Sequence, residues 1–302
     1  METTYACIPC MLKAQVHTMQ VIGLLRRDPA LAERIYRESL RMLAGDDWSR
    51  PAIRSARALN KLLMEAARVP DPYGALRAQS NAAALAHVPA HRALLHANAA
   101  AHAQSREEQL RCALSLSAAG NVVDFTAEVQ IALDDALRAA VADRPMLAVD
   151  DTAALDAALA RAQSLLFVCD NSGEAAFDKL LLERVAELYP GVARVAVACK
   201  AAPLLNDVLR ADCLDVGFGE LAFGPARAPV TFVELGQGDG VGDWPDDPRL
   251  LDGYDVVVSK GQANYEAMCG WRRGVFFVLT CKCDAIAASV GGVLMGRVVK
   301  QV

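Results

Sequence analysis

Residues 165–179, LLFVCDNSGEAAFDK, form the stretch that most constrains the fold of this chain. The stretch begins with five apolar residues, which predict a strand that is buried on both faces of a sheet. Asp170 and Asn171 follow at the carboxyl end of this strand, and a Ser-Gly pair then allows a sharp turn. An amphipathic run predicted as a helix begins at Glu174. A strand, a polar turn and a helix in this order are typical of an open α/β sheet, which binds its ligands where the strands end.

The two polar residues after the strand have the chemistry of a cation site. A carboxylate and an amide put hard oxygen atoms at the rim of the sheet, where a cation such as Mg²⁺ or Mn²⁺ is well held. The alternative is structural, because Asn171 or Ser172 can cap the following helix without binding a ligand.

The two halves of the chain differ in their hydrophobic patterns. Up to about residue 162, apolar residues recur every three or four positions, which predicts an almost entirely helical region. The expected helices are 9–25, 30–43, 51–67, 73–103, 107–116, 126–141 and 152–161, with Pro89 kinking or splitting the fourth. After that, β-branched runs alternate with helical segments, and the expected strands are 165–169, 194–199, 230–234, 254–259, 275–279 and 292–299. The prediction is an α/β protein with a helical N-terminal cap domain (1–162) and a doubly wound, Rossmann-like α/β/α sandwich (163–302).

A second polar turn contains Asp207. It follows the predicted strand 194–199 and is expected near the start of the next helix, on the same sheet edge as Asp170. A carboxylate there completes a cation site with Asp170 and Asn171. The alternative is an acidic residue whose only role is a favourable interaction with the helix dipole.

A third turn, Lys260-Gly261, ends the predicted strand 254–259. Gly261 permits a tight backbone turn, and the next residues begin a helix whose free N–H groups favour an anion. A lysine beside such a helix start is suited to clamp a phosphate. A surface lysine next to a structural glycine is the alternative.

Asn121 and Asp124 interrupt the helical half within GNVVDF, residues 120–125. Taken alone, this segment indicates a helix C-cap at Gly120 followed by a new N-cap.

The cysteines allow a weaker metal hypothesis. Nine cysteines, an odd number, are spread over 302 residues, which indicates reduced thiols and a cytoplasmic protein rather than a disulfide framework. Cys7 and Cys10 have metal-ligand or redox spacing, and with Cys281 and Cys283 they can form a structural zinc site. Against zinc, a single residue separates the second pair, and no histidine lies near either pair.

Charge and hydropathy exclude several classes of function. With 31 Lys and Arg against 36 Asp and Glu, the net charge of −5 gives no electrostatic footprint for nucleic acid. No run reaches the roughly 18 apolar residues of a membrane span, and the first residues lack a signal-like pattern, so a soluble protein is expected. No Gly-x-x-x-x-Gly-Lys-Ser/Thr motif is present, so a P-loop is not expected.

Taken together, these motifs resemble the damage-control phosphatase family (ARMT-like), in its prokaryotic branch with a Cys-x-x-Cys pair. The segments that carry the resemblance span nearly the whole chain: CIPC (7–10), DPY (71–73) with Asn81, GNVVDF (120–125), DNSGE (170–174) with FDK (177–179), NDV (206–208), KGQANYE (260–266) and KC (282–283). Ser172, where the family often has alanine, and Arg77, where lysine is common, depart from the pattern.

The resemblance implies a metal-dependent phosphatase that acts on small phosphorylated metabolites, including sugar phosphates. It implies that Asp170, Asn171 and Asp207 bind a divalent metal (Mn²⁺, Ni²⁺, Co²⁺ or Mg²⁺) and, with Lys260, are the catalytic residues. The residues expected to bind the substrate or its phosphate are Asn121, Asp124, Glu174, Lys260, Gly261 and Asn264.

The expected chemistry agrees with the residues. A dication neutralises phosphoryl oxygens and orients or ionises a water, while a lysine stabilises charge on the transferring group. Water is our favoured nucleophile, and direct attack by Asp170 or Asp207 is the alternative.

Two other functions stay open at this stage. One is an S-adenosylmethionine-dependent carboxyl methyltransferase, as relatives have been described, although no Gly-x-Gly loop follows the first strand. The other is a non-catalytic metal-binding module with the four-cysteine zinc site. The sequence predicts a small phosphorylated metabolite as the partner, with no nucleic acid and no membrane, and does not indicate an oligomeric state.

Overall fold

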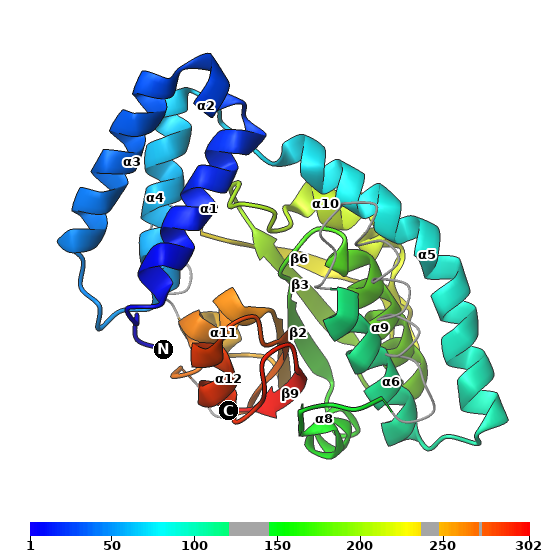
Figure 1. Cartoon of the computed structure of the whole chain (residues 1–302). Helices are drawn as coiled ribbons and strands as arrows, with labels where there is room; N and C mark the ends of the chain where they lie inside the picture. Colours follow the sequence, from blue (N-terminus) through cyan, green and yellow to red (C-terminus); the bar gives the residue numbers. More distant parts are fainter. Residues whose placement is uncertain (121–144, 237–247, 272–273) are drawn as a thin grey trace.

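A mostly parallel sheet forms the centre of the molecule (Figure 1). The computed structural model describes residues 1–120, 145–236, 248–271 and 274–302. Within these residues, seven strands form the sheet in the order β1-β9-β8-β7-β2-β3-β6, with β9 antiparallel to β8 and the other neighbours parallel. Their bounds are β1 Val149–Asp150, β2 Ser164–Val168, β3 Arg194–Lys200, β6 Thr231–Leu235, β7 Val256–Lys260, β8 Val275–Thr280 and β9 Arg297–Gln301. A short antiparallel pair, β4 Ala222–Phe223 and β5 Ala228–Pro229, lies outside this sheet.

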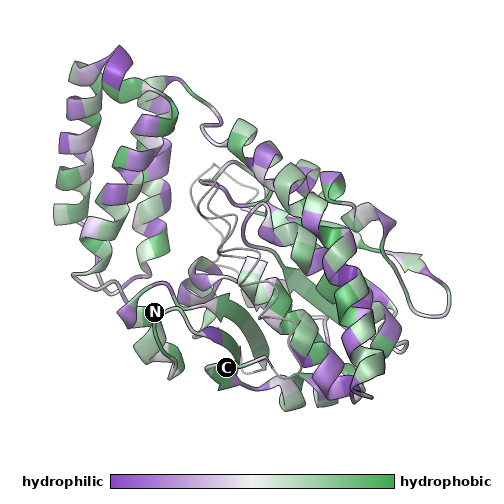
Figure 2. Cartoon of the chain, turned by 45° about the vertical axis from the view of Figure 1, so that its right-hand side comes forward, coloured by the Kyte–Doolittle hydropathy of each residue, from purple (hydrophilic) through white to green (hydrophobic). Residues whose placement is uncertain are grey.

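Alternate residues of the central strands face opposite layers of helices. In β2, Leu165 and Phe167 belong to one apolar cluster, whereas Leu166 and Val168 belong to another. The first cluster includes residues of α5 (Gly74–Ala101), α6 (Arg106–Ala119), α8 (Thr152–Leu159) and α9 (Glu174–Leu188). The second includes residues of α11 (Gln262–Met268) and α12 (Asp284–Val290). Burial on both faces explains the continuous apolar run of this strand, and the sheet is strongly hydrophobic in Figure 2.

The first four helices form a separate bundle, which stands apart from the helices that cover the sheet (Figure 1). They are α1 Cys7–Val21, α2 Leu24–Arg27, α3 Pro29–Ala44 and α4 Ala52–Ala67. Two small apolar clusters hold the bundle together, one around Met19 and Leu63 and the other around Met11 and Leu59. The chain start ties the bundle to the sheet layer, because the Met1 ammonium donates to the carbonyl of Glu266 in α11 at 2.6 Å.

The fold-class prediction is confirmed: the protein is α/β, with a helical N-terminal region and a mostly parallel central sheet. The first apolar cluster contains residues from both sides of position 162, the predicted domain boundary. It joins α5, α6 and α8 to β2 and α9. The division into domains 1–162 and 163–302 stays a prediction. The expected helix 126–141 lies outside the described residues, and the short strand β1 was not expected. No helix in the described ranges has the length and apolar character needed to cross a bilayer.

The predicted split of the fourth helix at Pro89 was wrong, because α5 continues through this residue as one helix. The alternative, a kink at Pro89, stays a prediction. The proline lies on the exposed side of this long helix. Water can therefore bond the carbonyl that loses its backbone donor, and the buried side of α5 keeps its contacts with the sheet layer.

The place of α6 in the sheet core can be tested with one substitution. Leu114 in α6 is fully buried in the first cluster. We expect Leu114→Ala to lower the free energy of unfolding by about 3 kcal/mol, because it removes buried surface and leaves a cavity. Leu40 on α3 is 44% exposed, and Leu40→Ala is expected to change stability by less than about 0.5 kcal/mol. Urea unfolding followed by circular dichroism measures the stability of both variants. Equal losses of stability would contradict the placement of Leu114 in the core.

Candidate active site

The loops after β2 and β3 are joined by backbone pairing. Asn171 and Asp207 form an isolated antiparallel bridge, and the N–H of Val208 donates to the carbonyl of Asp170 at 2.9 Å. The pairing brings the three predicted metal ligands next to one another. The following helix, α10 (Arg210–Asp215), begins beyond Asp207, so this carboxylate is not in the first turn, and an interaction with the helix dipole does not explain it.

The two aspartates are buried close to each other. Asp170 is 5% exposed and Asp207 is 7% exposed. Burial raises the pKa of Asp170 well above its usual value, and the negative charges of Glu174 and Asp207 raise it further. Burial also raises the pKa of Asp207, against the opposing effect of Lys200. Buried carboxylates that repel each other are stabilised by an added cation.

Gly261 allows the carboxylate of Asp170 to lie against the backbone at the end of β7. Its φ of +79° is unfavourable for residues with a side chain, and a Cβ atom built on it would lie 1.9 Å from Asp170 Oδ2. Only glycine fits at this position without displacing the carboxylate. Gly261 therefore acts through close approach, in addition to the sharp turn that the sequence predicts.

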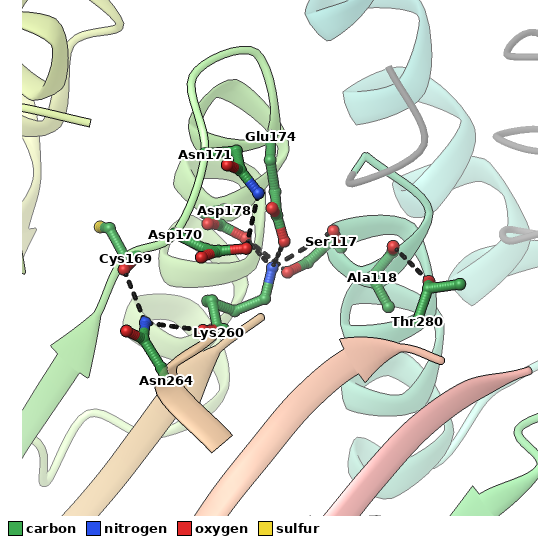
Figure 3. Close-up of polar contacts among 10 residues, drawn as sticks. All are labelled: Ser117, Ala118, Cys169, Asp170, Asn171, Glu174, Asp178, Lys260, Asn264 and Thr280. Atoms are coloured by element: carbon green, nitrogen blue, oxygen red, sulfur yellow. Dashed lines mark hydrogen bonds and ion pairs between the residues drawn. The ribbon is translucent and has the colours of Figure 1, made fainter. Parts of the chain in front are cut away.

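Lys260 lies in a fully buried ion-pair cluster with carboxylates of α9 (Figure 3). Its Nζ atom is 2.5 Å from Glu174 Oε1 and 2.6 Å from Asp178 Oδ1, and it also donates to the carbonyl of Ser117 in α6 at 3.3 Å. From the sequence, Lys260 is expected to clamp a phosphate and to act in catalysis. These roles stay predictions, and its Nζ atom is bonded to protein groups instead. In this structure Lys260 joins β7, α9 and α6.

Two carboxylates share the single charge of Lys260. Burial raises the pKa of Asp178 to about 7, although Lys260 lowers it. Asp178 Oδ1 also accepts a hydrogen bond of 2.6 Å from the Ser117 hydroxyl. Because one lysine cannot neutralise two carboxylates, a proton on Asp178 is favoured at a higher pH than for an exposed aspartate.

Lys200 is a second buried lysine that sequence reasoning missed. Its Nζ atom donates to Asn264 Oδ1 at 3.1 Å and lies 3.5 Å from Asp207 Oδ2. The Nδ2 group of Asn264 donates to the carbonyls of Cys169 and Lys260, so the amide oxygen is oriented toward Lys200. The signal was present in the sequence, because Lys200 ends β3 as Lys260 ends β7, on the edge that also carries Asp170.

The remaining predicted residues have different outcomes. Asn121 and Asp124 lie outside the described residues. Asn81 of α5, quoted in the family pattern, accepts a hydrogen bond of 2.7 Å from the N–H of Gly173 and so holds the loop after β2. The roles assigned to Glu174, Gly261 and Asn264 in substrate binding stay predictions, although all three lie in this cluster.

The four-cysteine zinc hypothesis is only partly matched by the geometry of the described residues, because Cys7 and Cys283 lie within electrostatic reach of Cys10 but do not form a ligand set with it. Cys281 is buried in the second apolar cluster, whereas Cys10 and Cys283 are exposed. In the described part of the chain, no group of three or more His, Cys, Asp or Glu side chains is arranged to hold a metal ion. The candidate set of Asp170, Asn171 and Asp207 is not a group of this kind, because it has only two carboxylates and its third donor would be the amide oxygen of Asn171.

Comparison with known proteins identifies the family. A family model described as the damage-control phosphatase ARMT1-like domain matches residues 3–298, so the chain belongs to this family of phosphatases. This confirms the resemblance found in the sequence, and it supports a phosphatase with a role in metabolite repair.

Individual relatives agree with the family assignment. A damage-control phosphatase of Pyrococcus horikoshii is 28% identical over 180 residues, which are 58% of this chain and 59% of that protein. A damage-control phosphatase of Archaeoglobus fulgidus is 24% identical over 312 residues and covers 100% of this chain and 99% of that protein. The crystal structure of a DUF89 family protein from P. horikoshii has a TM-score of 0.75 at 21% identity, covering 100% of this chain and 99% of that one, and shows the same fold.

The close approach at Gly261 predicts a specific effect of Gly261→Ala. We expect a loss of stability larger by at least about 1 kcal/mol than that of Gly253→Ala, because a Cβ at position 261 clashes with Asp170. Gly253 is the matched control, since its φ is +89° and a Cβ atom there would meet nothing within 4 Å. Chemical denaturation of both variants measures the difference, and equal losses would mean that backbone strain alone explains Gly261.

The raised pKa of Asp178 predicts a dependence of stability on pH. Between its usual pKa near 4 and its native pKa of about 7, the native state binds more protons than the unfolded state. The free energy of unfolding contributed by this group therefore falls as pH rises through this window, by at most about 1.4 kcal/mol per pH unit. Asp178→Asn removes the titrating group, so the slope is expected to be smaller in that variant. Urea unfolding of chelator-treated protein at several pH values tests this, and an unchanged slope would contradict it.

Proposed function

We propose that this protein is a divalent-metal-dependent phosphatase that hydrolyses phosphate monoesters of small metabolites. Family membership supports the phosphatase class. The observation that carries the proposal is the bridge between Asn171 and Asp207, which puts two buried, mutually repelling carboxylates beside an amide at the carboxyl edge of the sheet.

The residues present fit a divalent cation. Carboxylate and amide oxygens are hard donors, which suits Mg²⁺ or Mn²⁺ and also permits Co²⁺ or Ni²⁺. Asp207 Oδ2 is buried and has no hydrogen bond, although Lys200 lies 3.5 Å away. Asp170, Asn171 and Asp207 would hold the ion, which supplies positive charge for phosphoryl oxygens and lowers the pKa of water. Positive charge between Asp170 and Asp207 would also remove the repulsion that raises the pKa of Asp170.

The other residues of the cluster position these ligands. Gly261 leaves room for the Asp170 carboxylate, and Asn171 Nδ2 donates to Asp170 Oδ2 at 2.6 Å. Lys260 compensates the charges of Glu174 and Asp178, which keeps α9 against β7. Lys200 remains at the rim beside Asp207, where a cationic group can meet an anionic substrate.

Hydrolysis of p-nitrophenyl phosphate in the presence of Mn²⁺, Co²⁺, Ni²⁺ or Mg²⁺ tests the proposal. We expect Asp170→Asn to lower kcat/KM by at least about 100-fold. Substitution of a residue that only hydrogen-bonds a metal ligand can already cost about 100-fold in activity, and loss of the ligand itself should cost at least as much. Asp252→Asn, at an exposed site before β7, is the matched control and is expected to keep full activity.

Metal binding gives a second readout in the same proteins. Mn²⁺ at 100 times its Kd should raise the free energy of unfolding of the wild type by about 2.7 kcal/mol, and this gain should be absent in Asp170→Asn. Hydrolysis that persists after chelation, or that is undiminished in Asp170→Asn, would overturn the proposal.

A further inference from the structure

A pocket of about 250 Å³ lies between α4 of the helical bundle and the loop after β3. Arg57, Asn60 and Lys61 of α4 form one wall, and Lys200 and Leu204 form part of the other. Its volume is just below the roughly 300–1,000 Å³ that is usual for small-molecule sites, so it is suited to a small metabolite.

The pocket reaches the candidate metal ligands through Lys200. This side chain lines the pocket, and its Nζ atom is 3.5 Å from Asp207 Oδ2. The pocket therefore lies at the carboxyl edge of the sheet, where open α/β sheets bind their ligands. A second cavity, of about 580 Å³, lies at the amino ends of β2 and β3, next to Asp255. That carboxylate accepts hydrogen bonds from the backbone of Gln163 and Ser164, so its role there is structural.

Arg57 brings a positive charge from the bundle to the same place. Burial raises the pKa of Asp207, and both Lys200 and Arg57 oppose this rise, so the guanidinium lies within electrostatic reach of the pair. An arginine keeps its charge at any physiological pH and presents donors that match the geometry of a phosphate. The neighbouring Lys61 is instead 3.8 Å from Glu65 on the same helix, as an exposed pair one turn apart.

The cation that the sequence assigned to phosphate is engaged elsewhere. Lys260 is fully buried and bonded to two carboxylates, so a phosphoryl group would have to displace at least one of them to reach its Nζ atom. Displacement would leave a buried carboxylate without its partner, which is strongly unfavourable. Lys200 also has partners, Asn264 and Asp207, but unlike Lys260 it lines a pocket together with Arg57. An anion in this pocket can therefore meet both cations without breaking the Lys260 cluster.

We propose that this pocket is the substrate subsite, and that Arg57 and Lys200 bind the phosphoryl group of a small phosphomonoester there. The inference rests on the proposed function, which it deepens by naming the residues that hold the phosphate. It gives the bundle a direct part in binding, because Arg57 contacts the substrate from α4. The leaving group then faces the remainder of the α4 wall, where Asn60 and Met64 lie.

Calorimetric titration of inorganic phosphate, with and without Mn²⁺, tests the subsite without any turnover. Loss of charge-assisted hydrogen bonds should weaken phosphate binding by about tenfold or more in Arg57→Ala, with a smaller loss in Arg57→Lys. Arg54→Ala is the matched control, because Arg54 is half-buried on the same helix but does not line the pocket. Its affinity should stay within about twofold of the wild type, and the thermal unfolding of all three variants confirms that they fold.

Steady-state kinetics separates this inference from the proposed function. Arg57→Ala is expected to raise the KM for p-nitrophenyl phosphate more than it lowers kcat. If the wild type binds phosphate through Arg57 but hydrolyses no phosphomonoester, the subsite stands and the proposed function fails. If hydrolysis occurs while Arg57→Ala keeps the wild-type phosphate affinity and KM, the subsite is wrong and the proposed function stands.

Discussion

Burial of negative charge at the carboxyl edge of the sheet is the constraint on which the rest of the site depends. Four carboxylates there are less than one-tenth exposed: Asp170, Glu174, Asp178 and Asp207. Such groups are stable in the interior only when cations or hydrogen-bond donors compensate them. Lys260 compensates two of them and Lys200 a third. Asp170 is repelled by its neighbours, which is why the edge is suited to a further positive charge, from a metal ion or from a substrate-binding group.

The two lysines show how the same position in a strand leads to different roles. Lys200 and Lys260 each end a parallel strand, and both ammonium groups lie at the same edge of the sheet. The difference comes from what packs above them. The first turns of α9 bring Glu174 and Asp178 over β7, which encloses Lys260 completely. The end of β3 is covered by a loop and by α4, so Lys200 keeps one side on a pocket. A fully buried cation with two carboxylate partners stabilises the architecture, whereas Lys200 keeps its partners Asn264 and Asp207 and also lines a pocket.

The sequence was sufficient to predict the main strands of the sheet and the edge where the polar turns lie, because these depend on local patterns. The apolar run of β2, the turn at Asp170 and Asn171, and the helix from Glu174 are encoded within 15 residues. The partners of Lys260 could not be predicted in this way. Glu174 and Asp178 are 86 and 82 positions away, and Ser117 is 143 positions away, so their contacts depend on how α9 and α6 pack.

The pairing of the loops after β2 and β3 could not be predicted for a related reason. Asp207 lies near the start of α10 and on the same sheet edge as Asp170, as expected. Its bridge to Asn171, however, joins two loops that are separated in the sequence by α9 and β3. The continuity of α5 through Pro89 likewise depends on which side of the helix faces solvent, which a proline in the sequence does not reveal.

In the proposed function, the residues assigned to chemistry and those assigned to substrate selection lie on different parts of the fold. Asp170, Asn171, Asp207 and the Lys260 cluster lie on the strand ends and on α9, where displacement of one group leaves another buried and unpaired. The α4 wall of the pocket is different, because its residues project from a bundle with its own small apolar clusters. Substitutions at Arg57 or Asn60 therefore change the shape and charge of the pocket without removing any of the proposed metal ligands. If the proposed subsite is correct, the α4 wall is where differences in specificity between members of the family are expected to lie.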